Sequence, residues 1–348
     1  MRGQTSIQVT AISPFLAACR RERVERTPVW FMRQAGRYMP EYRALRERYS
    51  LLEMIRTPEL AAQVTLMPRR LGVDALILFA DILLPLVPLG LDVEFVPGRG
   101  PVLAHPIRSP QDVQRLRPVH LEEDLGFVLE TVRLVRREVD GRLPLIGFAG
   151  APFTLASYMI EGGSSRRYLR TKQFMYEYPQ AWHTLMATLA QVTLEYLRAQ
   201  VRAGAQAVQL FDSWVGALSP HDYRLYVLPY TRLIMEGLAD LGVPRIHFST
   251  GTAGMLPLIK QAGGDVISVD WRVDLDRAWA ILGEDVAIQG NLDPAVLLAP
   301  RDIIAREVRR ILRQAQGRPG YIFNLGHGVL PETDVNTVRW VVDLVHNE

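Results

Sequence analysis

Short apolar runs rich in β-branched residues alternate with longer stretches of helical periodicity along almost the whole sequence. This alternation is typical of repeated βα units, in which helices cover a parallel sheet. One such helix is predicted at residues 181–203, where apolar residues recur at helical spacing. Eight strands are predicted, at residues 28–32, 74–79, 144–148, 206–211, 243–248, 265–269, 285–288 and 320–324.

Eight strands in strict alternation with helices predict an α/β fold of the (β/α)8 TIM-barrel type, and a length of 348 residues suits a single barrel domain over residues 1–348. Extra length lies in residues 33–73, which are expected to hold two helices near the N-terminus, and in residues 81–143. Within the second stretch, alternation at residues 91–107 across the sequence Pro-Gly-Arg-Gly-Pro predicts an additional β-hairpin. An open doubly wound sheet is the alternative, although no Gly-x-Gly-x-x-Gly motif follows the first strand.

The composition argues against several classes of protein. The longest apolar run, residues 75–91, is broken by Asp81 and two prolines, so no membrane partner is expected, and the start has no signal-peptide pattern. A single cysteine, Cys19, leaves no disulfide framework and no cysteine-based zinc cluster, and it indicates the cytoplasm. Of the 40 basic residues only Lys172 and Lys260 are lysines, and no basic block suggests nucleic acid. The abundant arginines favour an anionic ligand, although arginine-rich codon usage is the simpler explanation.

Polar residues follow the carboxyl ends of the predicted strands, where the active site of such a barrel lies. Arg33 and Arg37 are four residues apart, so both guanidinium groups would face one anionic ligand if this segment is helical. Alternatively, the two arginines form ordinary salt bridges on the surface. Asp81 ends an apolar strand, where a buried carboxylate is either desolvated or paired with a partner. The alternative is a structural role, in which Asp81 caps the next loop. The other candidates are Tyr158 beyond the third strand, Ser213 after the fourth and His327 after the eighth.

Six longer segments occur in order over nearly the whole chain. They are PVWFMRQAGRYMPE at 28–41, ADIL at 80–83, IGFAGAPFTLASYMIEGG at 146–163, QLFDS at 209–213, GNLDP at 290–294 and FNLGHGVLP at 323–331. Together they resemble the signature segments of the uroporphyrinogen decarboxylase family, and the first and third are long and highly specific. The resemblance implies a barrel enzyme of haem biosynthesis that converts the four acetate side chains of uroporphyrinogen III to methyl groups. The products are coproporphyrinogen III and four CO2, and the family needs neither a metal nor an organic cofactor.

The resemblance also implies roles for particular residues. Arg33 and Arg37 would meet substrate carboxylates, Asp81 would contact the pyrrole N–H groups, and these three are the predicted catalytic residues. Residues predicted to bind the substrate are Arg33, Gln34, Ala35, Gly36, Arg37, Asp81, Tyr158, Ser213 and His327. Apolar walls are expected from Phe148, Phe211 and Trp271. The family is typically a cytoplasmic homodimer with active-site clefts at the dimer interface.

The sequence alone leaves two other functions possible. A methyltransferase of the corrinoid or methionine-forming type would share the barrel, but such enzymes commonly hold zinc through histidine and cysteine. Here Cys19 lies far in sequence from His327. A non-catalytic tetrapyrrole-binding protein would need the same pocket without turnover.

Overall fold

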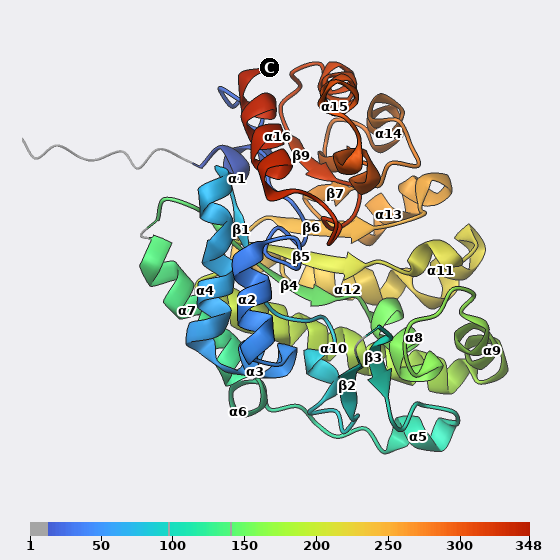
Figure 1. The fold of residues 1–348 in the computed structure, drawn as a ribbon. Helices are drawn as coiled ribbons and strands as arrows, with labels where there is room; N and C mark the ends of the chain where they lie inside the picture. Colours follow the sequence, from blue (N-terminus) through green and yellow to red (C-terminus); the bar gives the residue numbers. More distant parts are fainter. Residues whose placement is uncertain (1–12, 97, 140) are drawn as a thin grey trace, which may run out of the picture.

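A parallel sheet of seven strands forms the centre of the molecule in the computed structural model, which describes residues 13–96, 98–139 and 141–348 (Figure 1). The strands pair in the order β1-β4-β5-β6-β7-β8-β9, so each strand lies beside the next one along the chain in this sheet. They are β1 Leu76–Ile77, β4 Leu145–Gly150, β5 Ala207–Asp212, β6 Arg245–Ser249, β7 Val266–Ser268, β8 Ala287–Leu292 and β9 Tyr321–Leu325. Every pairing is parallel, as expected when a helix returns the chain after each strand. Seven of the eight predicted strands therefore correspond to observed ones.

The remaining predicted strand, residues 28–32, pairs only briefly. Val29 forms an isolated parallel bridge with Phe323 of β9, and on the other side Asp74 N–H donates to Val29 O at 2.8 Å. Pro28 has no N–H to donate, and Arg33 has a φ of 58°, which ends the extended conformation. The segment thus lies between β9 and the residues that precede β1, with too few ladder bonds to form a regular strand.

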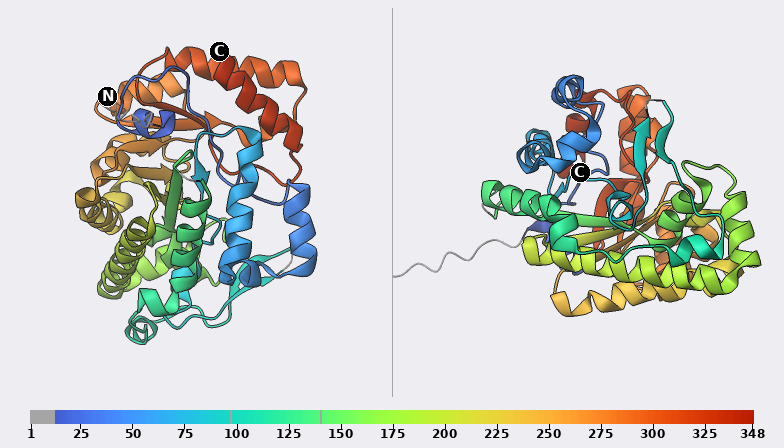
Figure 2. Two further views of the ribbon diagram at one scale, coloured as in Figure 1. Left: turned by 90° about the vertical axis from the view of Figure 1, so that its left-hand side faces the viewer. Right: turned by 90° about the horizontal axis from the view of Figure 1, so that it is seen from below.

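Helices connect the strands and cover the outer face of the curled sheet (Figures 1 and 2). The predicted helix at residues 181–203 is α10, Pro179–Ala203, which begins with proline at its first turn and ends at Gly204 with a φ of 125°. The other helices are α1 Pro14–Cys19, α2 Pro40–Arg48, α3 Leu51–Arg56, α4 Pro58–Leu66, α5 Pro110–Gln114, α6 Leu121–Asp124, α7 Gly126–Val139, α8 Pro152–Glu161, α9 Leu169–Glu177, α11 Pro220–Tyr226, α12 Leu228–Gly237, α13 Leu256–Ala262, α14 Leu275–Leu282, α15 Arg301–Ala315 and α16 Val335–Asn347. None of the helices in the described ranges is both long and apolar enough to cross a membrane.

Two long connections place structure at the carboxyl edge of the sheet. Residues 33–73 hold three α-helices, α2 to α4, where the sequence pattern predicts two. The division comes from a capping box between Ser50 and Glu53, which starts α3, and from Pro58, which starts α4. The predicted hairpin is also present: β2, Val93–Val96, pairs with β3, Gly100–Leu103, in antiparallel register outside the main sheet.

A buried polar chain crosses the inside of the curled sheet beneath its carboxyl edge. Trp30 Nε1 donates to Gln289 Oε1 at 2.9 Å, and Gln289 Nε2 donates to Gln209 Oε1 at 3.1 Å and to Ser268 Oγ at 3.0 Å. All four side chains are fully buried, so these bonds replace the water that the bonded atoms lose. The chain links the segment before Arg33 to β5, β7 and β8, and gives the site above it a fixed floor.

Candidate active site

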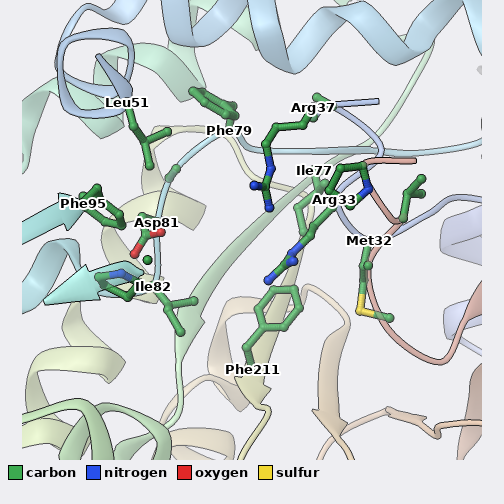
Figure 3. A pocket seen from close by; sticks show the side chains of 18 of the residues that line it. Met32, Arg33, Arg37, Leu51, Ile77, Phe79, Asp81, Ile82, Phe95 and Phe211 are labelled. Atoms are coloured by element: carbon green, nitrogen blue, oxygen red, sulfur yellow. The ribbon is translucent and has the colours of Figure 1, made fainter. Parts of the chain in front are cut away.

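A cavity of about 880 Å³ opens at the carboxyl ends of the strands (Figure 3). It is bordered by the segment after Met32, by α2, by the loop after β1, by the hairpin turn and by the ends of β4, β5, β6 and β9. The lining residues are Met32, Arg33, Ala35, Gly36, Arg37, Tyr42, Arg46, Leu51, Ile77, Leu78, Phe79, Ala80, Asp81, Ile82, Phe95, Val96, Gly98, Arg99, Gly100, Pro101, Phe148, Phe211, Ser213, Phe248, His327, Gly328, Val329 and Pro331. This volume and its mostly apolar walls suit a large organic ligand.

Seven of the nine residues predicted to bind a substrate lie in this lining. They are Arg33, Ala35, Gly36, Arg37, Asp81, Ser213 and His327, which come from segments far apart in the sequence. Phe148 and Phe211 also border the cavity, as expected. Trp271 does not line it; its ring packs against Gly326 and beneath the guanidinium of Arg272.

Gln34 lies outside the cavity lining. Its side chain is fully buried, its Oε1 accepts from Phe31 N–H at 3.0 Å and its Nε2 donates to Ala75 O at 3.0 Å. Both polar ends are therefore used within the protein. Tyr38 donates to the Gln34 carbonyl at 2.6 Å and holds the same segment from the other side. The position of Gln34 explains how the chain carrying Arg33 and Arg37 is held in place, and gives no support to a direct contact between its side chain and a ligand.

Tyr158, on α8, also lies outside the lining, but it is close to the cavity. Its half-buried ring lies against that of Trp214, with 3.9 Å between ring centroids. Burial and, to a smaller extent, the nearby negative charge of Asp81 raise the pKa of Tyr158 to about 12, against smaller opposing effects of the Ser164 side chain and Arg33. Tyr158 is therefore a neutral hydroxyl beside Asp81 at neutral pH.

Arg33 and His327 are brought together by a glycine. A Cβ on Gly328 would overlap with the Arg33 side chain, so the close approach of Arg33 needs a residue without a side chain at position 328. Burial and, to a smaller extent, the charge of Arg33 lower the pKa of His327 to about 4, against a smaller opposing effect of Asp270. His327 Nδ1 accepts from Gly328 N–H at 2.7 Å. The neutral imidazole can thus present Nε2–H to a ligand.

Asp81 follows β1 and is half-buried at the cavity wall. Its Oδ1 accepts from Leu83 N–H at 2.8 Å, as the alternative role of a loop cap predicts. Burial raises the pKa of Asp81, and this effect exceeds the lowering by the Leu83 hydrogen bond and by the charge of Arg33. In Figure 3 the guanidinium groups of Arg33 and Arg37 project into the space that Asp81 and Phe211 border. One carboxylate and two cations therefore face the same space.

Sequence reasoning missed two further arginines of the lining, Arg46 on α2 and Arg99 in the hairpin turn. With Arg33 and Arg37 they supply four guanidinium groups, whereas Asp81 is the one carboxylate in the lining among the residues that the structure describes. Within residues 13–96, 98–139 and 141–348, none of these four arginines forms a salt bridge. Positive charge in a partly apolar enclosure attracts an anionic ligand.

Sequence reasoning also missed a set of hydrogen bonds that holds Ser213 in place. Thr154 Oγ1 donates to Asp212 Oδ1 at 3.0 Å and accepts from Trp214 N–H at 3.3 Å, while Thr250 Oγ1 donates to Ser213 O at 2.6 Å. Asp212 is fully buried, and burial raises its pKa to about 7 against the lowering effect of Thr154. These bonds fix the backbone of Ser213 at the cavity edge.

No cluster of three or more histidine, cysteine, aspartate or glutamate side chains that could hold a metal is present in the described part of the chain. The groups that could hold an organic ligand are the guanidinium groups, Asp81, Ser213 and His327. Such a set can bind several carboxylates at the edge of a ligand and N–H donors nearer its middle.

The family model described as uroporphyrinogen decarboxylase (URO-D) matches residues 10–348. The chain belongs to the uroporphyrinogen decarboxylase family. Its relatives include proteins named uroporphyrinogen decarboxylase from Sorangium cellulosum, 59% identical over 96% of this chain and 95% of the relative, and from Carboxydothermus hydrogenoformans, 56% identical over 95% of each. A third, from Chloroflexus aurantiacus, is 57% identical over 96% of this chain and 95% of the relative. The resemblance seen in the six sequence motifs is thus confirmed.

Among solved structures, a methyltransferase from Methanosarcina mazei has a TM-score of 0.80 at 19% identity and covers 96% of this chain and 97% of that one. A B12-independent methionine synthase from Shewanella sp. W3-18-1 has a TM-score of 0.54 at 12% identity, covering 85% and 86%. At such identities the likeness concerns the fold alone. This chain therefore shares its fold with these two proteins, whereas its sequence relatives carry the name uroporphyrinogen decarboxylase.

Proposed function

We propose that this protein removes the four acetate carboxylates of uroporphyrinogen III and gives coproporphyrinogen III and four CO2. The observation that carries the proposal is a cavity in which four guanidinium groups and one carboxylate border apolar walls, in a chain of this family. Uroporphyrinogen has acid side chains all around a ring of pyrroles whose N–H groups point inward. Guanidinium groups pair with carboxylates, and a carboxylate accepts from N–H donors, so both parts of the ligand find matching groups.

The reaction needs a sink for the electron pair of the broken C–C bond. Protonation of the ring carbon next to the acetate gives a cationic pyrrole, which accepts that pair as CO2 leaves. The resulting methylene takes a proton to become a methyl group, and the ring carbon then releases its added proton. The pyrrole itself is the sink, so no cofactor takes part in the proposed reaction.

Asp81 is proposed to stabilise the cationic pyrrole. Its carboxylate is held by Leu83 N–H and faces a partly buried space, where a preorganised charge acts strongly on charge that develops in the transition state. Arg33 and Arg37 are proposed to bind acid arms and orient the reacting ring. Ser213, Tyr158 and His327 would contact other polar groups of the macrocycle. Ala35 and Gly36 would lie against it, and Gln34 would act by holding their loop.

We also propose that residues 1–348 form one closed (β/α)8 domain with residues 28–32 as its eighth strand. Support comes from the Val29–Phe323 bridge, the Asp74–Val29 hydrogen bond and the Trp30–Gln289 hydrogen bond, which join the segment to both edges and to the interior of the sheet. The protein is further proposed to be a cytoplasmic homodimer, on the basis of its family and its single cysteine. Sedimentation equilibrium tests the dimer, and a mass equal to one chain would contradict it.

Anaerobic incubation of the purified protein with uroporphyrinogen III tests the activity. We expect porphyrinogens with seven, six and five carboxylates to appear and then to converge on four, with matching release of CO2; oxidation after the incubation converts them to porphyrins for chromatography. Tight binding without loss of carboxylates would instead identify a tetrapyrrole-binding protein. A stoichiometric zinc content in the purified protein, together with no release of CO2, would favour the methyltransferase alternative.

A further inference from the structure

Arg99 occupies the turn of the β2–β3 hairpin, which is an addition to the barrel. The flanking glycines Gly98 and Gly100 have φ values of 76° and 77°, in the region that glycine adopts without strain. Arg99 N–H donates to Val96 O at 3.1 Å, which closes the turn. Both glycines and Arg99 lie in the cavity lining, so the turn faces the site and not the outer surface alone. In the right-hand view of Figure 2 the hairpin stands on the same side of the sheet as α2 and α3.

The hairpin is attached to the structure that carries Tyr158. Val102 of β3 forms an isolated antiparallel bridge with Gly163, and Leu103 N–H donates to Gly162 O at 3.0 Å. Farther on, Ile107 N–H donates to Met159 O at 2.8 Å. These bonds join β3 and the residues after it to α8 and to the residues at its C-terminal end. The turn is therefore held over the cavity by backbone pairing, whereas the exposed side chain of Arg99 stays free to adjust to a ligand.

The charge of Arg99 is not used by a salt bridge within the described parts of the chain. In contrast, Arg245 and Arg272 pair with carboxylates at 2.7 and 2.5 Å. Arg99 also comes from a part of the chain remote from Arg33 and Arg37, so it approaches the cavity from a different element. A ligand with carboxylates on one side only would leave it without a partner.

We infer that Arg99 is a specificity-determining residue that binds a carboxylate arm of the macrocycle from the hairpin side. The inference rests on the proposed function and assigns the hairpin a part in recognising a ligand that carries acid groups all around its edge. Arg99 contributes binding and not chemistry, because an exposed guanidinium on a glycine-flanked turn adds little to the electrostatics at the reacting carbon. Its effect therefore appears in ligand affinity, and the effect weakens with salt.

Replacement of Arg99 by glutamine and by lysine tests the inference, with Arg115→Gln as the matched control. Arg115 is an exposed arginine beyond the same hairpin and outside the cavity lining. Binding is measured by quenching of tryptophan fluorescence with uroporphyrin III, the oxidised and unreactive form with eight carboxylates. Arg99→Gln is expected to weaken binding roughly ten-fold at low salt. Arg99→Lys recovers part of the loss because it keeps the charge but not the two-pronged geometry.

Steady-state turnover of uroporphyrinogen III then separates binding from chemistry. Arg99→Gln should raise KM by the same factor as the dissociation constant and leave kcat within about two-fold. Equal affinity and equal KM in Arg99→Gln and Arg115→Gln would overturn the inference. If the unmodified protein binds uroporphyrin III through Arg99 but releases no CO2, the proposed decarboxylation fails while the role of Arg99 stands.

Discussion

At the scale of single residues, Asp81 is the group whose replacement should separate chemistry from binding. Asp81→Asn keeps the size of the side chain and an oxygen that can accept from Leu83 N–H, but it removes the negative charge. We expect kcat for uroporphyrinogen III to fall roughly 10²–10³-fold, as for other lost groups that stabilise transition-state charge, while KM changes by less than about ten-fold. Single-turnover and steady-state assays measure the two effects.

The matched control for Asp81 is Asp92→Asn, which removes an exposed carboxylate outside the cavity lining. This variant should keep the kcat and KM of the unmodified protein. If Asp81→Asn also keeps normal turnover, Asp81 has no electrostatic part in the reaction.

Asp212 should give the protein a pH-dependent stability. Burial raises its pKa in the folded protein to about 7, whereas the unfolded chain releases the proton near the usual value of 3.8. Between these two values the folded state holds a proton that the unfolded state has lost, so the Asp212 contribution to the free energy of unfolding falls as pH rises. The fall is about 1.4 kcal/mol for each pH unit between about 4 and 7, and it ends above the folded pKa.

Urea unfolding at a series of pH values tests this effect by comparing the unmodified protein with Asp212→Asn. The amide stays neutral, so the stability of the variant relative to the unmodified protein should increase from pH 5 to pH 7 and then stay constant. Asp343→Asn, an exposed change on α16, is the control and should follow the unmodified protein. Parallel curves for Asp212→Asn would show that Asp212 is charged in the folded state.

The sequence motifs predicted which residues gather at the site but not how each is used. Gln34 stands between two lining arginines, yet its amide is satisfied by Phe31 and Ala75. A sequence pattern does not show into which space such a side chain turns. Asp212 was not predicted as a support of the site, because its burial at the end of β5 and its hydrogen bond to Thr154 depend on the fold.

At the scale of elements, the loops after β5 and β6 meet too closely for a side chain between them. A Cβ on Gly216 would overlap with Thr250 O and approach the backbone of Gly251, so Gly216→Ala must push the two loops apart. Ser213 is bonded to Thr250 through its carbonyl, and it should move with them. We expect a loss of about 1–3 kcal/mol in the free energy of unfolding together with a raised KM.

Gly254→Ala is the control for this change. Gly254 lies just beyond the same β6 loop, and nothing lies within 4 Å of a Cβ built there. Its stability and KM should match those of the unmodified protein. An unchanged KM in a destabilised Gly216→Ala would mean that the loop contact supports the fold without positioning Ser213.

The sequence predicted where strands and helices lie along the chain better than it predicted how they are placed in the fold. The spacing of apolar residues predicted seven of the strands, α10 and the hairpin, because burial of one or both faces of an element requires apolar residues at regular positions. No such pattern in the sequence shows the direction in which the hairpin points. It depends on the pairing of Val102 with Gly163, two residues far apart in the chain. Arg99 was therefore not recognisable as a lining residue before the fold was known.

At the scale of the whole molecule, Asp74 links the segment before Arg33 to the C-terminal helix, beside the edge of the sheet that β1 forms. Its Oδ2 accepts from Val29 N–H at 2.8 Å and lies 2.7 Å from His346 Nε2, while its Oδ1 accepts from Arg26 at 2.8 Å. Asp74 is almost fully buried, so no water can replace these partners easily. One side chain thus connects the segment before Arg33, the start of β1 and the C-terminal helix α16.

Asp74→Ala should therefore loosen the contacts at this edge of the sheet and, through them, the site. Loss of the carboxylate leaves Val29 N–H and His346 without their partner, which we expect to cost about 2–4 kcal/mol of the free energy of unfolding in urea. Asp334→Ala, which removes only the exposed N-cap of α16, should cost about 1 kcal/mol. Residues 28–32 lead directly into Arg33, so hydrogen exchange at the amides of residues 29–32 and KM for uroporphyrinogen III should both rise in Asp74→Ala and not in Asp334→Ala. Equal losses in the two variants, with slow exchange retained at residues 29–32, would mean that Asp74 does not hold this edge of the sheet and that the polar chain through Trp30 does.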